Sequence, residues 1–274
     1  MIKTLKKLAL ITTATLLTTL PSLAGTGVKA MEDCNCKQPC LSIDGSLGVD
    51  FLSNFTFRGT VLDRNPVVRP YLGLSVPLPV GGGVFDAASL NLSVAQALTT
   101  KGASSRWSRT DASVGVAVVK GDFTVTTSYQ VVTSPNNTFN TADGVAVRVD
   151  YNDESLCPIL PALKPHVEAY FGLNNNPGNS TAAGAVGNYY EVGIAPSTEV
   201  LGNKVSVPVN VGFGAGGYYT GGKNYGYASA GVQVSREIAT NTTLTAGVTY
   251  LNSNDNVNSN KNNWISTIGL RYSF

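Results

Sequence analysis

The chain has 274 residues, of which 13% are charged and 43% are hydrophobic, and 29 are glycine. This composition excludes a disordered chain, and so low a charge is unusual for a soluble enzyme. The net charge of +2 includes three lysines among the first seven residues, and without them the basic and acidic residues nearly balance. The sequence therefore gives no electrostatic reason to expect nucleic-acid binding.

Residues 1–24 have the features of a secretory signal peptide. Three lysines precede an apolar run from Leu8 to Leu20, and the small residues Ser22 and Ala24 follow it. The run is too short for a membrane-spanning helix, which needs about 20 apolar residues. We therefore expect cleavage after Ala24, with a second possible site after Ala30, and export of the mature chain.

From Leu41 onward, apolar residues recur at every second position in segments of about nine to eleven residues, the length that a tilted strand needs to cross a bilayer. In residues 205–213, for example, every odd position is Val or Phe, and the even positions are Ser, Pro, Asn and Gly. The expected strands are residues 41–57, 67–77, 87–98, 110–120, 123–132, 143–151, 165–174, 188–195, 204–215, 225–234, 242–251 and 264–274. About 12 strands, an even number, is typical of bacterial barrels.

The alternation fits two all-β folds, a soluble sandwich and a transmembrane barrel. The small Gly, Ser and Thr residues on one face of the strands would pack badly in a sandwich core, and the chain ends within a strand. Aromatic residues also gather near the strand ends, where membrane barrels carry interfacial girdles. They are Phe55, Phe57, Tyr71, Tyr151, Tyr189, Tyr190, Tyr218, Tyr219, Tyr250, Trp264 and Tyr272. We therefore predict a transmembrane antiparallel up-and-down β-barrel over residues 41–274, in the bacterial outer membrane.

The last strand carries a candidate assembly signal. Leu270, Tyr272 and Phe274 alternate with small or polar residues up to the final position. This ending resembles the C-terminal signature that the outer-membrane barrel assembly machinery reads, and we expect that machinery to be a partner.

The run from Gly48 to Gly59, which contains Asp50-Phe51-Leu52-Ser53-Asn54 and then Phe55-Thr56-Phe57-Arg58-Gly59, resembles the opening of the TorF-like (Gcw_chp-type) family of outer-membrane porins. The match covers about 20 residues. The resemblance implies a barrel with a pore and supplies no catalytic residue. We expect Phe55 and Phe57 to anchor at the membrane interface and Arg58-Gly59 to turn into the first loop, with Arg58 either a solvated charge or a ligand contact.

The four cysteines predict a disulfide framework rather than a metal site, since an exported protein meets an oxidising compartment. Cys34, Cys36 and Cys40 lie in a leader, residues 25–40, and Cys157 lies in a long turn, residues 152–164. An even strand number places all of them on the periplasmic side. Two pairings remain open: a strap from the leader to Cys157 across the barrel mouth, and a local loop closed within the leader.

Charged residues are sparse on the expected inner faces and form two mixed-charge patches that oppose one another across the lumen. One contains Asp44, Asp50, Arg69 and Arg271, and the other contains Arg148, Asp150, Glu168 and Glu191. As a functional site they would form a constriction with a transverse field. As structural residues they would brace the wall as ion pairs, because an unpaired buried charge is costly.

The sequence predicts a porin-like channel for passive diffusion of small polar or ionic solutes, in contact with outer-membrane lipid and lipopolysaccharide. The alternative is a closed structural or adhesive barrel. His166 is the only histidine, and its expected place near the periplasmic end argues against catalysis, so we expect no enzyme, metal or cofactor. Basic residues in the expected outer loops indicate a weak anion preference: Arg58, Arg64, Lys101, Arg106, Arg109, Lys223 and Lys261.

Overall fold

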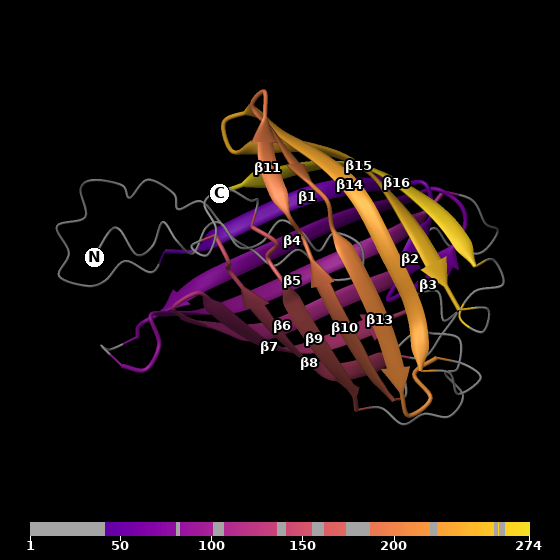
Figure 1. Ribbon diagram of the computed structural model, residues 1–274, viewed down its shortest axis with the longest axis horizontal. Coiled ribbons are helices and arrows are strands. Elements are labelled where there is room, and N and C mark those ends of the chain that lie inside the picture. The colour runs from indigo at the N-terminus through magenta and orange to yellow at the C-terminus, as the bar shows by residue number, and fades with distance from the viewer. Residues whose placement is uncertain are drawn as a thin grey trace.

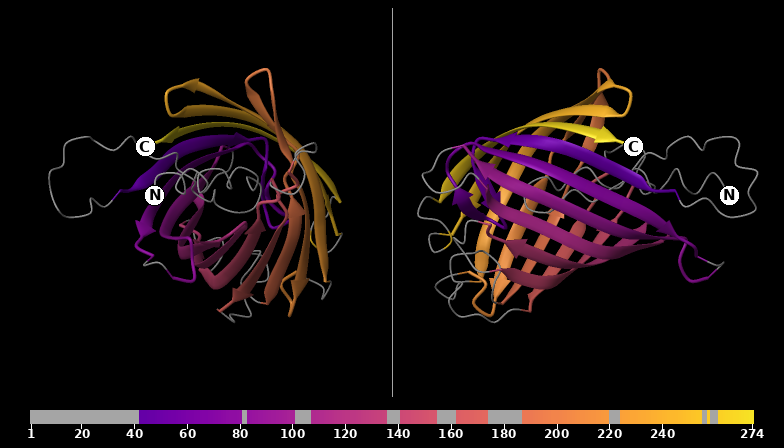
Figure 2. Two further views of the ribbon diagram at one scale, coloured as in Figure 1. Left: turned by 60° about the vertical axis from the view of Figure 1, so that its left-hand side comes forward. Right: turned by 180° about the vertical axis from the view of Figure 1, so that it is seen from behind.

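The computed structural model describes residues 42–80, 83–100, 107–135, 141–154, 162–173, 187–219, 224–254, 257 and 261–274. They form a closed antiparallel barrel of 12 wall strands, which confirms the predicted fold class (Figures 1 and 2). Within these ranges no helix is both long and apolar enough to cross a membrane. The signal peptide, the leader and all four cysteines lie outside the described residues.

The wall strands follow one another around the barrel in chain order. They are β1 (Asp44–Leu52), β4 (Val67–Leu78), β5 (Ala87–Thr99), β6 (Trp107–Lys120), β7 (Phe123–Thr133), β8 (Ala142–Tyr151), β9 (His166–Gly172), β10 (Asn188–Ile194), β13 (Val209–Ala215), β14 (Tyr225–Ala239), β15 (Thr242–Ser253) and β16 (Asn262–Ser273). The antiparallel pair of β1 and β16 closes the ring. We call the end at which β1 begins and β16 ends the terminal rim, and the opposite end the loop rim.

Two prolines divide one pair of strands near the terminal rim. Pro196 separates β10 from β11 (Ser197–Val200), and Pro208 separates β12 (Asn203–Ser206) from β13, because proline has no N–H for the ladder. β12 still pairs with β14, so these strands extend the wall on that side. The turns expected at 196–203 and 235–241 are therefore mostly strand, and the tight turn after β14 is confined to residues 240–241.

The wall is apolar on the outside and polar on the inside. On β16, Trp264, Ile268 and Leu270 point outward and are at least 42% exposed, whereas Ile265 between them is buried. Many of the buried residues on the inner side are polar, including Ser46, Asp111, Asn210, Gln233 and Thr249. This is the reverse of a soluble protein and the arrangement of a barrel that lies in lipid.

Aromatic pairs decorate the outside of both rims. Near the loop rim these are Phe171–Tyr190, Phe213–Tyr225 and Tyr250–Trp264, and at the terminal rim Phe123–Tyr151 and Tyr272–Phe274. The girdle expected from sequence is only partly correct, because several of its proposed members are buried instead. These are Phe55, Phe57, Tyr71, Tyr189, Tyr218 and Tyr219.

The first strand ends at Leu52 and not, as expected, at residue 57. Ser53 still bonds to β16 through its N–H and the Ser266 carbonyl at 3.0 Å, and Asn54 Nδ2 donates to the Trp264 carbonyl at 2.8 Å. The chain then leaves the wall and forms a hairpin of β2 (Phe55–Phe57) and β3 (Thr60–Asp63) inside the barrel (Figure 2). We call residues 55–63 the lumen hairpin.

Candidate functional site

The lumen hairpin turns through only two residues. Phe57 pairs with Thr60 across the turn, and both central residues have positive φ, 47° at Arg58 and 80° at Gly59. This is the geometry of a tight type I′ turn. The left-handed conformation costs a residue with a side chain about 1–2 kcal/mol, so the contacts of Arg58 must offset that strain.

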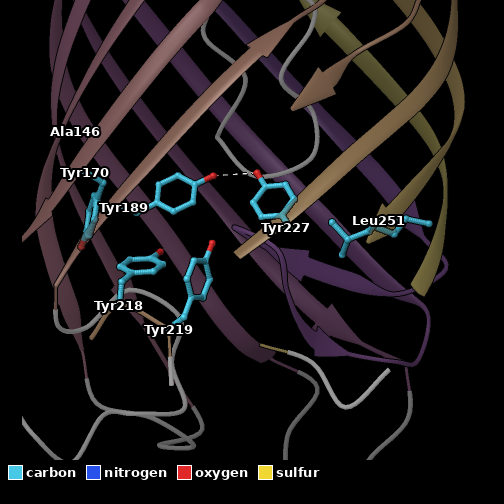
Figure 3. Packing of buried hydrophobic residues seen from close by; sticks show 8 residues of the cluster. Ala146, Tyr170, Tyr189, Tyr218, Tyr219, Tyr227 and Leu251 are labelled. Carbon is cyan, nitrogen blue, oxygen red and sulfur yellow. Dashed lines mark hydrogen bonds between the residues drawn. The ribbon is translucent and has the colours of Figure 1, made fainter. Parts of the chain in front are cut away.

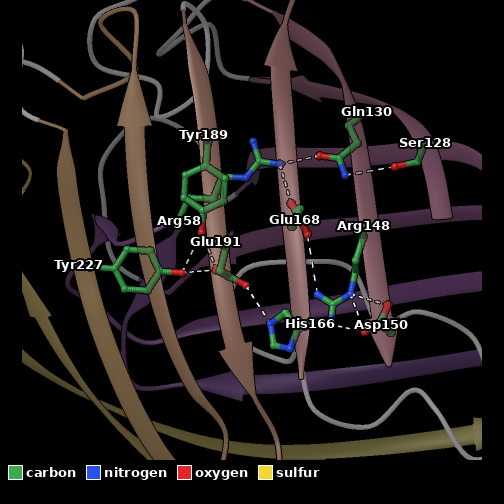
Figure 4. A network of polar contacts seen from close by, with 10 residues as sticks. All are labelled: Arg58, Ser128, Gln130, Arg148, Asp150, His166, Glu168, Tyr189, Glu191 and Tyr227. Atoms are coloured by element: carbon green, nitrogen blue, oxygen red, sulfur yellow. Dashed lines mark hydrogen bonds and ion pairs between the residues drawn. The ribbon is translucent and has the colours of Figure 1, made fainter. Parts of the chain in front are cut away.

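Arg58 is 1% exposed and is surrounded by partners from distant parts of the chain (Figure 4). Its Nη2 donates to Gln130 Oε1 at 2.9 Å and forms an ion pair with Glu168 Oε1 at 3.3 Å. Its guanidinium lies 3.9 Å from the centre of the Tyr170 ring, within cation–π range. Arg58 is thus not a solvated loop charge, and that expectation is wrong.

The backbone of the turn is also held. Tyr219 donates its hydroxyl to the Arg58 carbonyl at 2.8 Å, and Ser253 donates to the Gly59 carbonyl at 3.0 Å. The Tyr227 ring packs so closely that a Cβ on Gly59 would lie 2.3 Å from it. The turn therefore fits only a residue without a side chain at position 59.

Two tyrosines from the segment after β13 complete the surroundings of the turn. Tyr218 and Tyr219 fold into the lumen and pack with Tyr170, Tyr189 and Tyr227 (Figure 3). Arg58 Nη1 donates to the Tyr218 hydroxyl at 3.3 Å. Burial raises the pKa of Tyr218, which keeps this hydroxyl protonated. Bulky side chains therefore occupy the lumen at this level.

Strand register explains why the charged wall residues meet. Arg148 on β8, Glu168 on β9 and Glu191 on β10 occupy one row across the three strands. Arg148 Nη1 lies 3.8 Å from Glu168 Oε2, and Arg148 Nη2 lies 2.8 Å from Asp150 Oδ1. Glu191 accepts hydrogen bonds from the hydroxyls of two tyrosines, Tyr189 and Tyr227. The row thus extends the network around the barrel wall, as Figure 4 shows.

Inward glycines on β10 and β13 provide the space for these large side chains. Gly212 shares the row of Glu191, and a Cβ there would lie 2.2 Å from the Tyr227 ring. A Cβ on Gly193 would lie 2.5 Å from His166 Cε1. The glycine-rich composition therefore serves packing inside the lumen at these positions.

A second charged group contacts the phenylalanines of the lumen hairpin. Arg109 on β6 pairs with Asp111 at 2.6 Å, and Arg69 on β4 lies 3.9 Å from the same carboxylate. The Arg109 guanidinium lies 3.7 Å from the Phe57 ring centre and 5.8 Å from that of Phe55. Sequence reasoning had assigned Arg109 to an outer loop and missed this role, as it missed Asp111.

The eight charged residues predicted to line the pore alternate with outward side chains on their strands, so all face the lumen side. Arg148, Asp150, Glu168 and Glu191 belong to the network around Arg58. Arg69 lies opposite Asp50, a member of its predicted patch, in the β1–β4 register. Its ion pair, however, is with Asp111, which is outside that patch. Asp44 and Arg271 lie nearer the terminal rim, opposite Ser75 and Gly48.

The lumen residues that sequence reasoning missed are Arg109, Asp111, Gln130 and the inward-facing tyrosines. An arginine and an aspartate two apart within an alternating strand, as at 109 and 111, were a usable signal. The direction taken by Arg58 had no local signal, because its partners are 72 to 160 residues away.

Leu270 and Tyr272, two residues of the predicted assembly signal, lie on the outer face of β16, and the third, Phe274, follows the strand and is also exposed. Phe274 and Gly45 exchange two backbone hydrogen bonds of 2.9 and 2.8 Å where the first and last strands meet. The last residue thus takes part in closing the barrel.

His166 begins β9 at the terminal rim and is buried inside the barrel. Its Nε2 lies 3.5 Å from Glu191 Oε1. In the parts of the chain that the structure describes, no three acidic, histidine or cysteine side chains are placed to hold a metal ion.

Solved structures of outer-membrane barrels are similar to this one. The COG4313 outer membrane channel from Pseudomonas putida F1 aligns with a TM-score of 0.57 and 11% identity, over 86% of this chain and 97% of that chain. Outer membrane phospholipase A from Escherichia coli aligns with a TM-score of 0.47 and 13% identity, over 85% and 94%. The NanC porin aligns with a TM-score of 0.47 and 11% identity, over 84% and 99%.

At such identities, the first of these similarities shows the fold alone. No protein-family model matches the sequence, and a comparison with curated proteins gives no match. The TorF-like resemblance therefore gains no support beyond the general one to outer-membrane barrels.

Proposed function

We propose that the protein is a porin-like channel of the bacterial outer membrane that lets small polar or ionic solutes diffuse passively. The observation that carries this proposal is the closed 12-strand wall with its apolar side outward and its polar side inward. Outer-membrane lipid and lipopolysaccharide would contact the outer face, and the barrel assembly machinery would read the end of β16. The terminal rim would face the periplasm.

The inner face outside the Arg58 network suits water and polar solutes. Ser93 and Ser113 hydroxyls lie 2.7 Å apart on β5 and β6, and Ser235 and Thr245 hydroxyls lie 3.0 Å apart on β14 and β15. Such side chains supply hydrogen bonds without strong charge. They support passage that is weakly selective among small polar molecules.

The charged residues of the lumen are compatible with both roles predicted for them, bracing of the wall and a constriction with a transverse field. The ion pairs of Arg148 with Glu168 and of Arg69 with Asp111 join different strands and so support bracing of the wall. The same groups would order water and ions in the space beside them, as charged rings do in pores. The basic residues that hinted at anion preference are fewer than expected in the loops, since Arg58 and Arg109 lie within the barrel.

A closed structural barrel is the second candidate, and the lumen hairpin favours it. The hairpin and the tyrosines around it occupy the lumen at one level, where Arg58, Tyr189 and Tyr227 are all nearly inaccessible to solvent. We assign no catalytic role to His166 in either candidate, because its side chain is buried.

Recording from the purified protein in planar lipid bilayers distinguishes the two candidates. A channel gives conductance steps at a defined single-channel level, and a salt gradient then gives its ion selectivity. Absence of steps, also after reduction of disulfides, would decide for the closed barrel. Extraction into buffer without detergent would contradict both candidates.

A further inference from the structure

We infer that the lumen hairpin, residues 55–63, restricts passage through the barrel and that the Arg58–Glu168 ion pair holds it across the lumen. Arg58 is a positioning residue in this account. The inference deepens the proposed channel function and rests on it. It adds an identified constriction and an identified contact that keeps the constriction in place.

The hairpin reaches from one wall to the opposite wall. Its first end is fixed at β1 and β16, where Asn54 bonds to the Trp264 carbonyl at 2.8 Å. Its tip bonds to Glu168 on β9, which is the sixth strand from β1 in either direction around the ring. A segment that joins diametrically opposite strands must cross the centre of the lumen.

Contacts on both sides of the hairpin leave little room between it and the wall. Phe57 packs under Arg109 of β6 on one side, with 3.7 Å between guanidinium and ring centre. On the other side, Gly59 meets Tyr227 of β14 and Ser253 of β15. The hairpin is therefore enclosed by both halves of the wall and by the inward tyrosines.

Arg58 makes the only charged contact at the hairpin tip among the described residues. Its other contacts are cation–π contacts and hydrogen bonds to Gln130 and Tyr218. The wall does not need Arg58 for its own continuity, because β9 is bonded to β8 and β10 along its whole length. Removal of the ion pair is therefore expected to loosen the hairpin tip while leaving the barrel intact, since the hydrogen bonds from Tyr219 and Ser253 to the turn backbone remain.

Release of the hairpin also changes the charge of the lumen. Of the two arginines that form ion pairs with Glu168, only Arg148 would remain, at 3.8 Å. Asp150 and Glu191 lie on either side of Glu168 in the same network. An opened lumen is therefore expected to favour cations more than the native one, because an exposed carboxylate attracts them.

The test compares single-channel conductance and reversal potential in planar bilayers for the native chain, three test variants and one control. The test variants are Arg58→Gln, Glu168→Gln and a variant in which a short Gly-Ser linker between Asn54 and Arg64 replaces residues 55–63. Arg236→Gln is the matched control, since it removes one arginine at an exposed position of β14. Heat-modifiable migration on gels first selects the variants that are assembled.

The inference predicts severalfold larger conductance for the linker variant, a smaller increase for both point variants, and no change for Arg236→Gln. The reversal potential of the linker variant should shift toward cation selectivity. A silent native protein with a conducting linker variant would support the hairpin as the barrier while refuting passive diffusion through the native chain. A linker variant with native conductance, or one that is silent like the native protein, would overturn the inference.

Discussion

Arg58 and Glu168 are both almost fully buried, so each charge is compensated in part by the other. Removing one partner of a buried ion pair leaves an uncompensated charge and usually costs about 3–5 kcal/mol. We expect Arg58→Met and Glu168→Gln each to lower the free energy of unfolding by about that amount, and the double variant to lose less than the sum. Urea unfolding of the barrel in detergent micelles measures all three. Additive losses would contradict a direct coupling.

Alanine substitutions at Gly59 and Gly121 separate the stability cost of backbone strain from the cost of overpacking. Both glycines have positive φ, but a Cβ would lie 2.3 Å from Tyr227 at Gly59 and meets no atom within 4 Å at Gly121. Alanine at either position should cost about 1–2 kcal/mol for the left-handed backbone. Gly59→Ala should cost about 1–3 kcal/mol more from overpacking. Equal losses in the same unfolding assay would show that Tyr227 moves aside freely.

At the scale of elements, β16 closes the barrel, and Phe274 follows its last residue, Ser273. Phe274 exchanges backbone hydrogen bonds with Gly45 and packs its ring where a Cβ on Gly45 would lie 2.4 Å away. We expect deletion of Phe274, or Phe274→Asp, to block assembly rather than conduction, because this residue joins the first strand and ends the assembly signal that we predict. Membrane fractionation and heat-modifiable migration measure the result. Native amounts of inserted variant would count against the assembly role.

Alternating strands and tight turns together form the barrel wall. Period-two alternation sends one set of side chains to lipid and the other to the lumen, and each tight turn reverses the strand. The two proline interruptions, at Pro196 and Pro208, face each other where Val207 donates to the Pro196 carbonyl at 2.9 Å. The ladder therefore continues past both prolines, and the expected turn becomes an extension of the wall.

At the scale of the whole molecule, we predict a disulfide strap between the leader and the long turn from Asn152 to Pro165. The described ends of that turn lie at the terminal rim, because β8 ends there and β9 begins there. We expect Cys157 to pair with Cys34, Cys36 or Cys40. Cys157→Ser should then leave the barrel inserted and raise its conductance, because loss of the strap opens the periplasmic mouth and leaves the lumen residues unchanged.

Peptide mapping under non-reducing conditions checks the strap independently of conductance. A linked peptide that contains Cys157 and part of the leader is the expected result. Cys157 found as a free thiol would exclude the strap, and a bond confined to the leader would favour the local loop.

The wall of this protein follows from its sequence alone. The alternation from Leu41 to Phe274 predicts twelve strands, because the direction of a side chain along a strand depends only on position parity. The inward placement of Glu168 and Glu191 follows from the same parity. None of this requires knowledge of which strand lies opposite which.

The contents of the lumen were decided by the tertiary structure. Phe55 and Phe57 are as suitable for a lipid interface as for an aromatic interior, so their sequence does not determine where they lie. The direction of the hairpin depends on Glu168, which is 110 residues from Arg58 in the chain. Only closure of the barrel brings that carboxylate opposite the end of β1, where it gives the buried arginine a charged partner.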